Sequence, residues 1–171
     1  MNSMVKEITI PSELRNPFFF PSEKLIWKEE FAYKLNLGFT FFYEAAYFSG
    51  IDAIKPWENA EQYVPIIFKE WKAVKENLLE LFEKRDSVGA LQPMKKGIGI
   101  FLQAVFWSNH VPARLNGLNF DKLKVKPINV YERLEFIMNR PGNYHSFIQL
   151  SELMAEQEKQ FVKHMALKKR G

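Results

Sequence analysis

Two short polar clusters carry the side chains of this sequence that are best suited to chemistry. The first combines an imidazole, a cation and side-chain amides, in Ser108-Asn109-His110-Val111-Pro112 with Arg114 and Asn116. The second adds another imidazole and cation beside a phenol, in Arg140-Pro141-Gly142-Asn143-Tyr144-His145. Imidazole titrates near neutral pH, and guanidinium pairs with carboxylates and phosphates. If the fold brings the two clusters together, they would bind a small molecule or anion, either as a receptor or as an enzyme.

Each cluster also has a structural explanation. Asn109 and His110 can hydrogen-bond the last carbonyls of the helix that precedes them, while Arg114 offsets the negative end of that helix. A turn followed by a helix cap accounts for the second cluster in the same way. We therefore expect structural polar contacts from His110 and Arg114, and keep ligand binding as the alternative.

One carboxylate, Glu44, lies at the end of a largely apolar stretch and is predicted to be buried. A buried charge is stable only when it is paired, and Arg114 or Arg140 is the predicted partner. The hypothetical ligand site then comprises Glu44, Asn109, His110, Arg114, Arg140, Tyr144 and His145.

The motifs of metal, nucleotide and ester chemistry are missing from the sequence. None of the three His residues has a Glu or a second His three or four positions away, and there is no Cys. The Gly-rich phosphate loop, the dinucleotide-binding fingerprint and the serine elbow do not occur. We expect no metal, no cofactor and no catalytic residue, and regard an enzyme as the less favoured reading.

Most of the positive charge lies at the C-terminal end of the chain. The formal net charge is +4, yet five cations and no acid follow residue 158, so the rest of the chain carries about −1. Nucleic-acid-binding domains usually carry their charge as a patch on the folded body. The sequence predicts at most weak nucleic-acid contacts, through Lys163, Lys168, Lys169 and Arg170, and these cations would equally complement the helix dipole.

The sequence also predicts a cytoplasmic protein that does not enter a membrane. The N-terminal residues lack the apolar stretch of a signal peptide, and the absence of Cys suits a reducing compartment. The most apolar stretch, residues 98–107, is much shorter than the ~20 residues that span a bilayer.

The segments that position these side chains show mostly the apolar spacing of α-helices. Apolar residues spaced by three or four predict an all-α fold, with helices over residues 22–49, 65–85, 93–108, 130–139 and 143–168. The length of 171 residues fits a single domain, residues 1–171. We expect an irregular or orthogonal bundle of about five to six helices.

Residues 1–21 are predicted to form an extended, Pro-rich arm, because Pro11, Pro17 and Pro21 disfavour a helix. Three consecutive aromatic residues, Phe18 to Phe20, should pack this arm onto the helices, since exposed they would promote aggregation. Gly97 and Gly99 lie inside a predicted helix and indicate a close approach of a neighbouring element.

Several segments together resemble the YpoC-like family of Bacillus and its relatives. They are Ile10-Pro11-Ser12-Glu13-Leu14 with Pro17-Phe18-Phe19, then Trp107-Ser108-Asn109-His110, and Arg140-Pro141 with Tyr144 and Phe147-Gln149-Leu150. The resemblance implies a cytosolic protein without an assigned catalytic residue. The genes of this family tend to neighbour DNA replication and repair genes, which implies an accessory role in those processes.

We conclude from the sequence that a non-enzymatic helical module, binding an unknown protein partner, is the favoured reading. The ligand-binding site described above is the alternative, and weak nucleic-acid binding through the basic C-terminal end is the second alternative. Convergence of His110, Arg114, Arg140 and His145 on one pocket would favour the ligand site.

Overall fold

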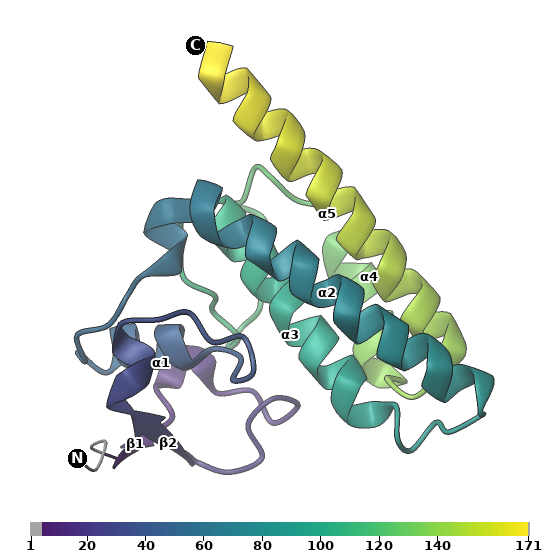
Figure 1. The fold of residues 1–171 in the computed structure, drawn as a ribbon, viewed down its shortest axis with the longest axis horizontal. Coiled ribbons are helices and arrows are strands. Elements are labelled where there is room, and N and C mark those ends of the chain that lie inside the picture. Colours follow the sequence, from purple (N-terminus) through teal and green to yellow (C-terminus); the bar gives the residue numbers. More distant parts are fainter. Residues whose placement is uncertain (1–4, 171) are drawn as a thin grey trace.

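The computed structural model describes residues 5–170, and this part of the chain is mostly helical (Figure 1). It contains five α-helices: α1 (Phe42–Phe48), α2 (Ala60–Glu83), α3 (Leu91–Ser108), α4 (Val130–Asn139) and α5 (Tyr144–Arg170). Two short strands, β1 (Val5–Thr9) and β2 (Lys24–Lys28), pair antiparallel with Ile8 opposite Leu25. The all-α prediction is right in outline, but it missed this sheet.

The predicted helix over residues 22–49 is wrong for most of its length. β2 and a 3-10 turn (Glu29–Ala32) occupy its first part, and only Phe42–Phe48 is α-helical. Along β2, Leu25 and Trp27 are buried while Lys24 and Ile26 are exposed, which is the two-residue alternation of a strand. The sheet pairing with β1, which local periodicity does not reveal, decides the conformation.

The segment before α1 is held in a turn by polar contacts. The Tyr43 hydroxyl donates to the Lys34 carbonyl at 2.5 Å and accepts from the Asn36 amide at 2.6 Å. Burial raises the pKa of Tyr43 to about 12, so the phenol stays protonated as this donor. The rings of Phe39 and Phe42 stack with centroids 4.9 Å apart across the turn.

The other helices lie close to their predicted positions. α3, α4 and α5 begin and end within two residues of 93–108, 130–139 and 143–168. α2 begins five residues before the predicted position 65 and contains Pro65 in its second turn. There the proline ring removes only the hydrogen bond to the carbonyl of the exposed Glu61, so the helix tolerates it.

α3 is the most deeply placed helix, and every residue from Gly97 to Ser108 is buried. A Cβ added at Gly97 would lie 2.8 Å from Cζ3 of Trp71 in α2 and 3.1 Å from Cδ2 of Leu150 in α5. A Cβ at Gly99 would lie 3.1 Å from Cγ2 of Thr40. The close approach predicted from the two glycines is therefore confirmed.

No helix within residues 5–170 is long and apolar enough to cross a bilayer.

The N-terminal arm packs onto the helical body, as predicted. Phe19 is buried, Phe18 and Phe20 are half-buried, and the Phe19 ring lies 5.1 Å from that of Phe41. The Glu13 carbonyl accepts the amides of Leu115 and Asn116 at 2.9 and 3.1 Å. The arm is not extended throughout, because it contributes β1 and a 3-10 turn (Ser12–Leu14).

Three helices end in the same way. At the ends of α1, α2 and α3 the chain turns through positive φ, at Gly50 (72°), Arg85 (56°) and His110 (61°). At α3 the amide of His110 donates to the Trp107 carbonyl at 2.9 Å, and that of Val111 to the Phe106 carbonyl at 3.2 Å. This pair of bonds is the Schellman motif, which favours glycine at the position that His110 occupies.

Candidate functional site

Glu44 lies in α1 with 0% of its surface exposed. Its Oε2 accepts hydrogen bonds from Trp107 Nε1 at 2.7 Å and from the Ala113 amide at 3.3 Å. Its Oε1 accepts from Gln103 Nε2 at 3.1 Å. The predicted burial is confirmed, but the predicted cation is wrong, because three neutral N–H groups take the place of a guanidinium.

The environment of Glu44 favours its neutral form. Burial raises the pKa of this carboxyl, since desolvation of the charge outweighs the opposing effect of the donors Trp107, Gln103 and Ala113. Gln103 Oε1 is buried without a hydrogen-bond partner. Rotating the Gln103 amide by half a turn would offer this oxygen to a protonated Glu44. Glu44 is therefore a polar link between α1, α3 and the following loop.

Asn109 has all four of its side-chain hydrogen-bonding positions occupied. Its Nδ2 donates to the carbonyls of Val105 and Val125 at 2.7 and 2.9 Å. Its Oδ1 accepts the amides of Lys124 and Val125, both at 2.9 Å. This side chain fastens residues 124–125 to the end of α3, which is the structural role expected for the first cluster.

His110 and Arg114 do not behave as expected. Both side chains are exposed, and within residues 5–170 the His110 imidazole makes no hydrogen bond or ion pair. Only its backbone takes part in ending α3, through the positive φ of 61°. The Arg114 guanidinium lies over the Phe48 ring, 5.4 Å from its centroid, and so covers α1 instead of pairing with Glu44.

The second cluster lies where α5 begins. Asn143 caps α5, because its Oδ1 accepts the His145 amide at 2.9 Å. Tyr144 is half exposed, and its ring lies 5.7 Å from that of Phe82. The side chains of Arg140 and His145 are exposed.

The structure does not bring the two clusters together. A Cβ at Gly142 would lie 3.2 Å from both Leu91 Cδ2 and the Ser87 carbonyl, so the second cluster borders the start of α3. The first cluster follows the end of α3, whose 18 residues span about 27 Å. The predicted ligand site therefore has no common pocket.

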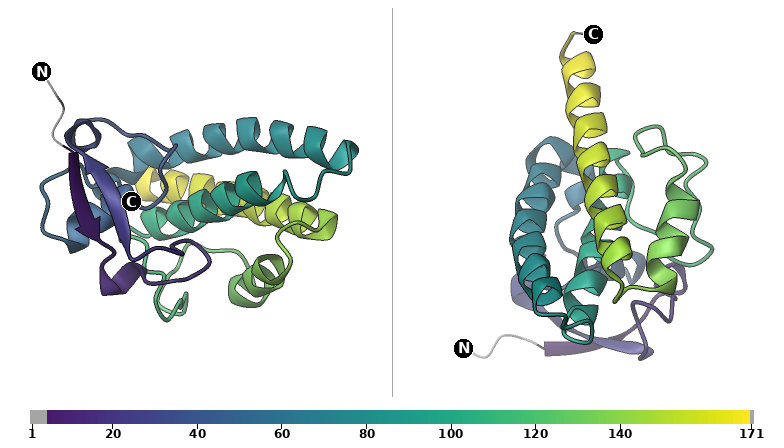
Figure 2. Two further views of the ribbon diagram at one scale, coloured as in Figure 1. Left: turned by 90° about the horizontal axis from the view of Figure 1, so that it is seen from below. Right: turned by 90° about the vertical axis from the view of Figure 1, so that its right-hand side faces the viewer.

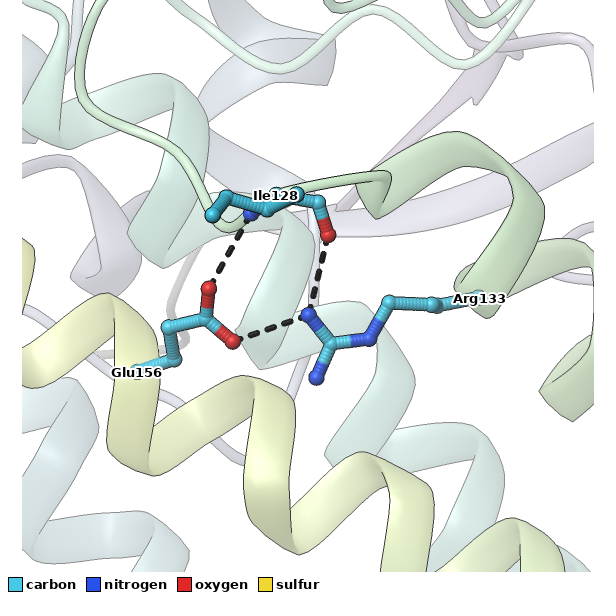
Figure 3. Close-up of polar contacts among 3 residues, drawn as sticks. All are labelled: Ile128, Arg133 and Glu156. Carbon is cyan, nitrogen blue, oxygen red and sulfur yellow. Dashed lines mark hydrogen bonds and ion pairs between the residues drawn. The ribbon is translucent and has the colours of Figure 1, made fainter.

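A closed set of contacts joins α4 to α5 (Figure 3). Arg133 Nη1 donates to Glu156 Oε2 at 2.8 Å and to the Ile128 carbonyl at 2.9 Å, while the Ile128 amide donates to Glu156 Oε1 at 3.1 Å. Burial alone would raise the pKa of Glu156, but these donors together lower it. Both charges are thus used inside the fold, and Arg133 is not a free cation.

The last part of α5 extends beyond the rest of the molecule (Figures 1 and 2). Phe161 is the last buried residue of this helix, and its ring lies 6.2 Å from that of Phe68. We call residues 162–170 the α5 end. Two apolar side chains of the α5 end, Val162 and Leu167, are 59% and 57% exposed. Its four cations are also exposed and have no ion-pair partner within residues 5–170: Lys163, Lys168, Lys169 and Arg170.

A second exposed surface, which sequence reasoning missed, lies on α4. We call Tyr131, Glu132, Glu135 and Phe136 the α4 face; its two aromatic side chains are 47% and 50% exposed. A hollow of about 550 Å³ beside it is lined by Asn129, Glu132, Arg133, Phe136 and Gln149. One feature of the sequence could have indicated this surface. Glu132 and Phe136 are four residues apart and therefore lie on the same side of the helix, opposite Leu134 and Ile137.

A metal site does not emerge from the described part of the chain. Among residues 5–170, no three His, Asp or Glu side chains gather so that they could hold a metal ion. The arrangement instead offers an exposed basic helix end and an exposed acidic and aromatic helix face, which are features of macromolecular contact surfaces.

Two comparisons with known proteins agree with each other. A family model described as YpoC-like protein matches residues 61–169, from α2 almost to the end of α5. "Uncharacterized protein YpoC" of Bacillus subtilis (strain 168) is 39% identical over 117 residues, which cover 66% of this chain and 70% of that protein. No solved structure matches the chain. The family match includes the α4 face and all of the α5 end except Arg170.

Proposed function

The chain belongs to the YpoC-like family, and we propose that it is a non-enzymatic helical interaction module whose contact surface is the α5 end. The observation that carries this proposal is the extension of α5 past its last buried residue, Phe161. Beyond Phe161 only Met165 still packs partly against the core, so packing against a partner would supply the burial that most of the α5 end lacks. Recognition of a helix by a groove commonly works in this way.

The composition of the α5 end also fits a contact surface. Val162 and Leu167 can bury apolar area, while the surrounding lysines and Arg170 select a partner of negative charge. The Arg133–Glu156 pair fixes the earlier part of α5 to α4, so the end is presented from a rigid base.

Site-specific photo-crosslinking tests the proposal. A photoreactive amino acid is placed at Val162 or at Leu167, and the chain is expressed in Bacillus subtilis. We expect discrete crosslinked products from these positions. Val88 is the matched control, because it is 76% exposed but lies in the turn between α2 and α3. Equal crosslinking at all three positions, or at none, would contradict the proposal.

Nucleic acid is a second candidate partner, favoured by the absence of any acid from the α5 end. Contacts with phosphates alone would be weak, independent of sequence and steeply reduced by salt. Gel-shift titration with duplex DNA at 50 and 200 mM salt tests this candidate. Deletion of residues 166–171 should abolish the binding, and tight or sequence-specific binding by the truncated chain would refute it.

A further inference from the structure

We propose that the α5 end of one molecule binds the α4 face of a second copy of the same chain, so that the molecules associate head to tail. This inference rests on the proposed function, since it names the partner of the α5 end. Both surfaces belong to the described part of the chain, and they are complementary in charge and in exposed apolar groups.

The two surfaces are complementary in charge. The α5 end carries four cations without an acid, whereas the α4 face carries Glu132 and Glu135. Neither glutamate has a hydrogen-bond or ion-pair partner within residues 5–170. The one cation that lines the hollow beside Glu132, Arg133, is already paired with Glu156 at 2.8 Å. Glu132 is therefore the unpaired charge that this hollow presents to an incoming basic helix, and Lys126 and Arg15 line only the neighbouring hollows.

The apolar groups of the two surfaces also match. Val162 and Leu167 of the α5 end are each more than half exposed, and Phe136 at the hollow is half exposed. The hollow of about 550 Å³ is large enough to receive apolar side chains of a helix. Burial of these groups against one another would remove apolar surface from water on both molecules.

A molecule cannot make this contact with itself. Glu156 in α5 contacts Arg133 and Ile128 at the start of α4, and the helix continues without a break to Arg170. The helix axis rises about 21 Å between residues 156 and 170, away from α4 (Figure 1). The same geometry makes the contact heterologous, because the two surfaces are different and lie apart on one chain.

Association of two α5 ends with each other is disfavoured because both are strongly basic. The head-to-tail contact is small, so we expect weak association that is visible only at high protein concentration. It should be sensitive to salt, since most of its complementarity comes from exposed charges.

Charge reversal in two separate variants provides the test. One variant carries Glu132→Lys and Glu135→Lys, and the other carries Lys163→Glu and Arg170→Glu. These four side chains are exposed and make no hydrogen bond or ion pair within residues 5–170, so the fold should be retained, which circular dichroism checks. Sedimentation velocity from about 10 μM to 1 mM in low salt measures the association.

The wild-type chain should associate with rising concentration, and each variant alone should lose at least about tenfold in affinity. A 1:1 mixture of the two variants should associate again, because the unchanged basic α5 end of the first fits the unchanged acidic α4 face of the second. Matched reversals of exposed charges elsewhere, Glu76→Lys with Glu83→Lys and Lys69→Glu with Lys72→Glu, should leave the association unchanged.

A monomeric wild-type chain at 1 mM, or a mixture that does not associate, would overturn the head-to-tail contact. Crosslinking from Val162 separates this failure from that of the proposed function. Products with twice the mass of the chain, carrying the second crosslinked residue on α4, support the contact between copies. Products that contain only a different protein, or only nucleic acid, would overturn the contact between copies. A product with a different protein would still support the proposed interaction module.

Discussion

The indole nitrogen of Trp107 donates a 2.7 Å hydrogen bond to Oε2 of Glu44, and both side chains are closed off from solvent. This contact fixes α1 against α3. It also places a titratable group where only neutral donors reach it, and therefore makes the stability of the fold depend on the protonation of one carboxyl.

Glu44→Gln should stabilise the protein at neutral pH relative to wild type. The folded-state pKa of Glu44 is raised, so its contribution to stability is fully present below the unfolded-state pKa and is lost as pH rises through the folded-state pKa. The loss amounts to about 1.4 kcal/mol for each unit of pKa difference. Urea unfolding between pH 4 and 8 measures it: the wild-type free energy should fall with pH relative to that of the variant, and parallel curves would contradict the assignment.

Glu44→Ala is the informative counterpart. It removes the acceptor for Trp107, Gln103 and the Ala113 amide, and each buried donor left without a partner costs about 1–3 kcal/mol. We expect a loss of several kcal/mol at every pH, together with a shift of Trp107 fluorescence in the native state. A fully stable alanine variant would show that these bonds do not support the fold.

Gly97→Ala should destabilise the fold even though alanine is the better helix former. The added methyl group would meet Trp71 at 2.8 Å and Leu150 at 3.1 Å, so α2 or α5 must move, at a cost of about 1–3 kcal/mol. Gly99→Ala meets Thr40 at 3.1 Å and should cost less. Thermal melts of the two variants give the order, and a more stable Gly97 variant would mean that the crossing is looser than described.

His110→Gly should stabilise the protein by roughly 0.5–1 kcal/mol, because φ at this position is 61° and glycine adopts it without strain. Gly50→Ala at the same position of α1, where φ is 72°, should cost a similar amount. Chemical denaturation compares the two. If His110→Gly lost stability, the imidazole would have to make a contact that the structure does not contain.

Arg114→Ala should have only a small effect, about 0.5–1 kcal/mol, since an exposed cation over an aromatic ring is worth no more. The ion pair with Glu44 that the sequence predicted would make the loss larger, because its removal would leave a buried charge unpaired. Equilibrium unfolding of this variant therefore shows whether Arg114 contacts Phe48 or Glu44. A loss of about 3 kcal/mol or more would indicate an ion pair with Glu44.

Deletion of residues 1–21 should lower the melting temperature by several degrees. It removes β1 and Phe19, whose ring packs against Phe41, and loss of one buried Phe costs about 3–5 kcal/mol. Phe19→Ala alone should reproduce most of the loss, whereas Phe18→Ala should cost less because Phe18 is only partly buried. Unchanged melting of the Phe19 variant would mean that the arm does not support the core.

The long helices could be predicted because each buries a stripe of residues spaced by three and four, a property of the local sequence. The 24–41 segment could not, because β2 depends on a partner strand that lies fifteen or more residues earlier in the chain. The burial of Glu44 was predictable from its apolar neighbours. Its donors were not, since Gln103 and Trp107 lie 59 and 63 residues away in the sequence.

For the candidate site residues, too, the sequence did not reveal contacts between distant parts of the chain. Asn109 was recognised at the end of a helix, but its contacts with residues 124–125 depend on how the following loop folds back. His110 drew attention as an imidazole, whereas its importance lies in its backbone conformation. The α4 face went unnoticed because two glutamates and two aromatic residues on a short helix resemble an ordinary solvent-exposed surface until the neighbouring hollow is seen.

The hydrogen bonds between Glu13 and the Leu115–Asn116 segment join residues that leave the ribosome at very different times. At a synthesis rate of about 5–20 residues per second, the carbonyl of Glu13 waits roughly 5–20 s before its donors have been made. The Phe41 ring, which lies 5.1 Å from that of Phe19, is made about 1–4 s after Phe19, so this contact can form long before the hydrogen bonds of Glu13. The nascent chain therefore carries the N-terminal arm without its full set of native contacts until residues 115 and 116 have been made.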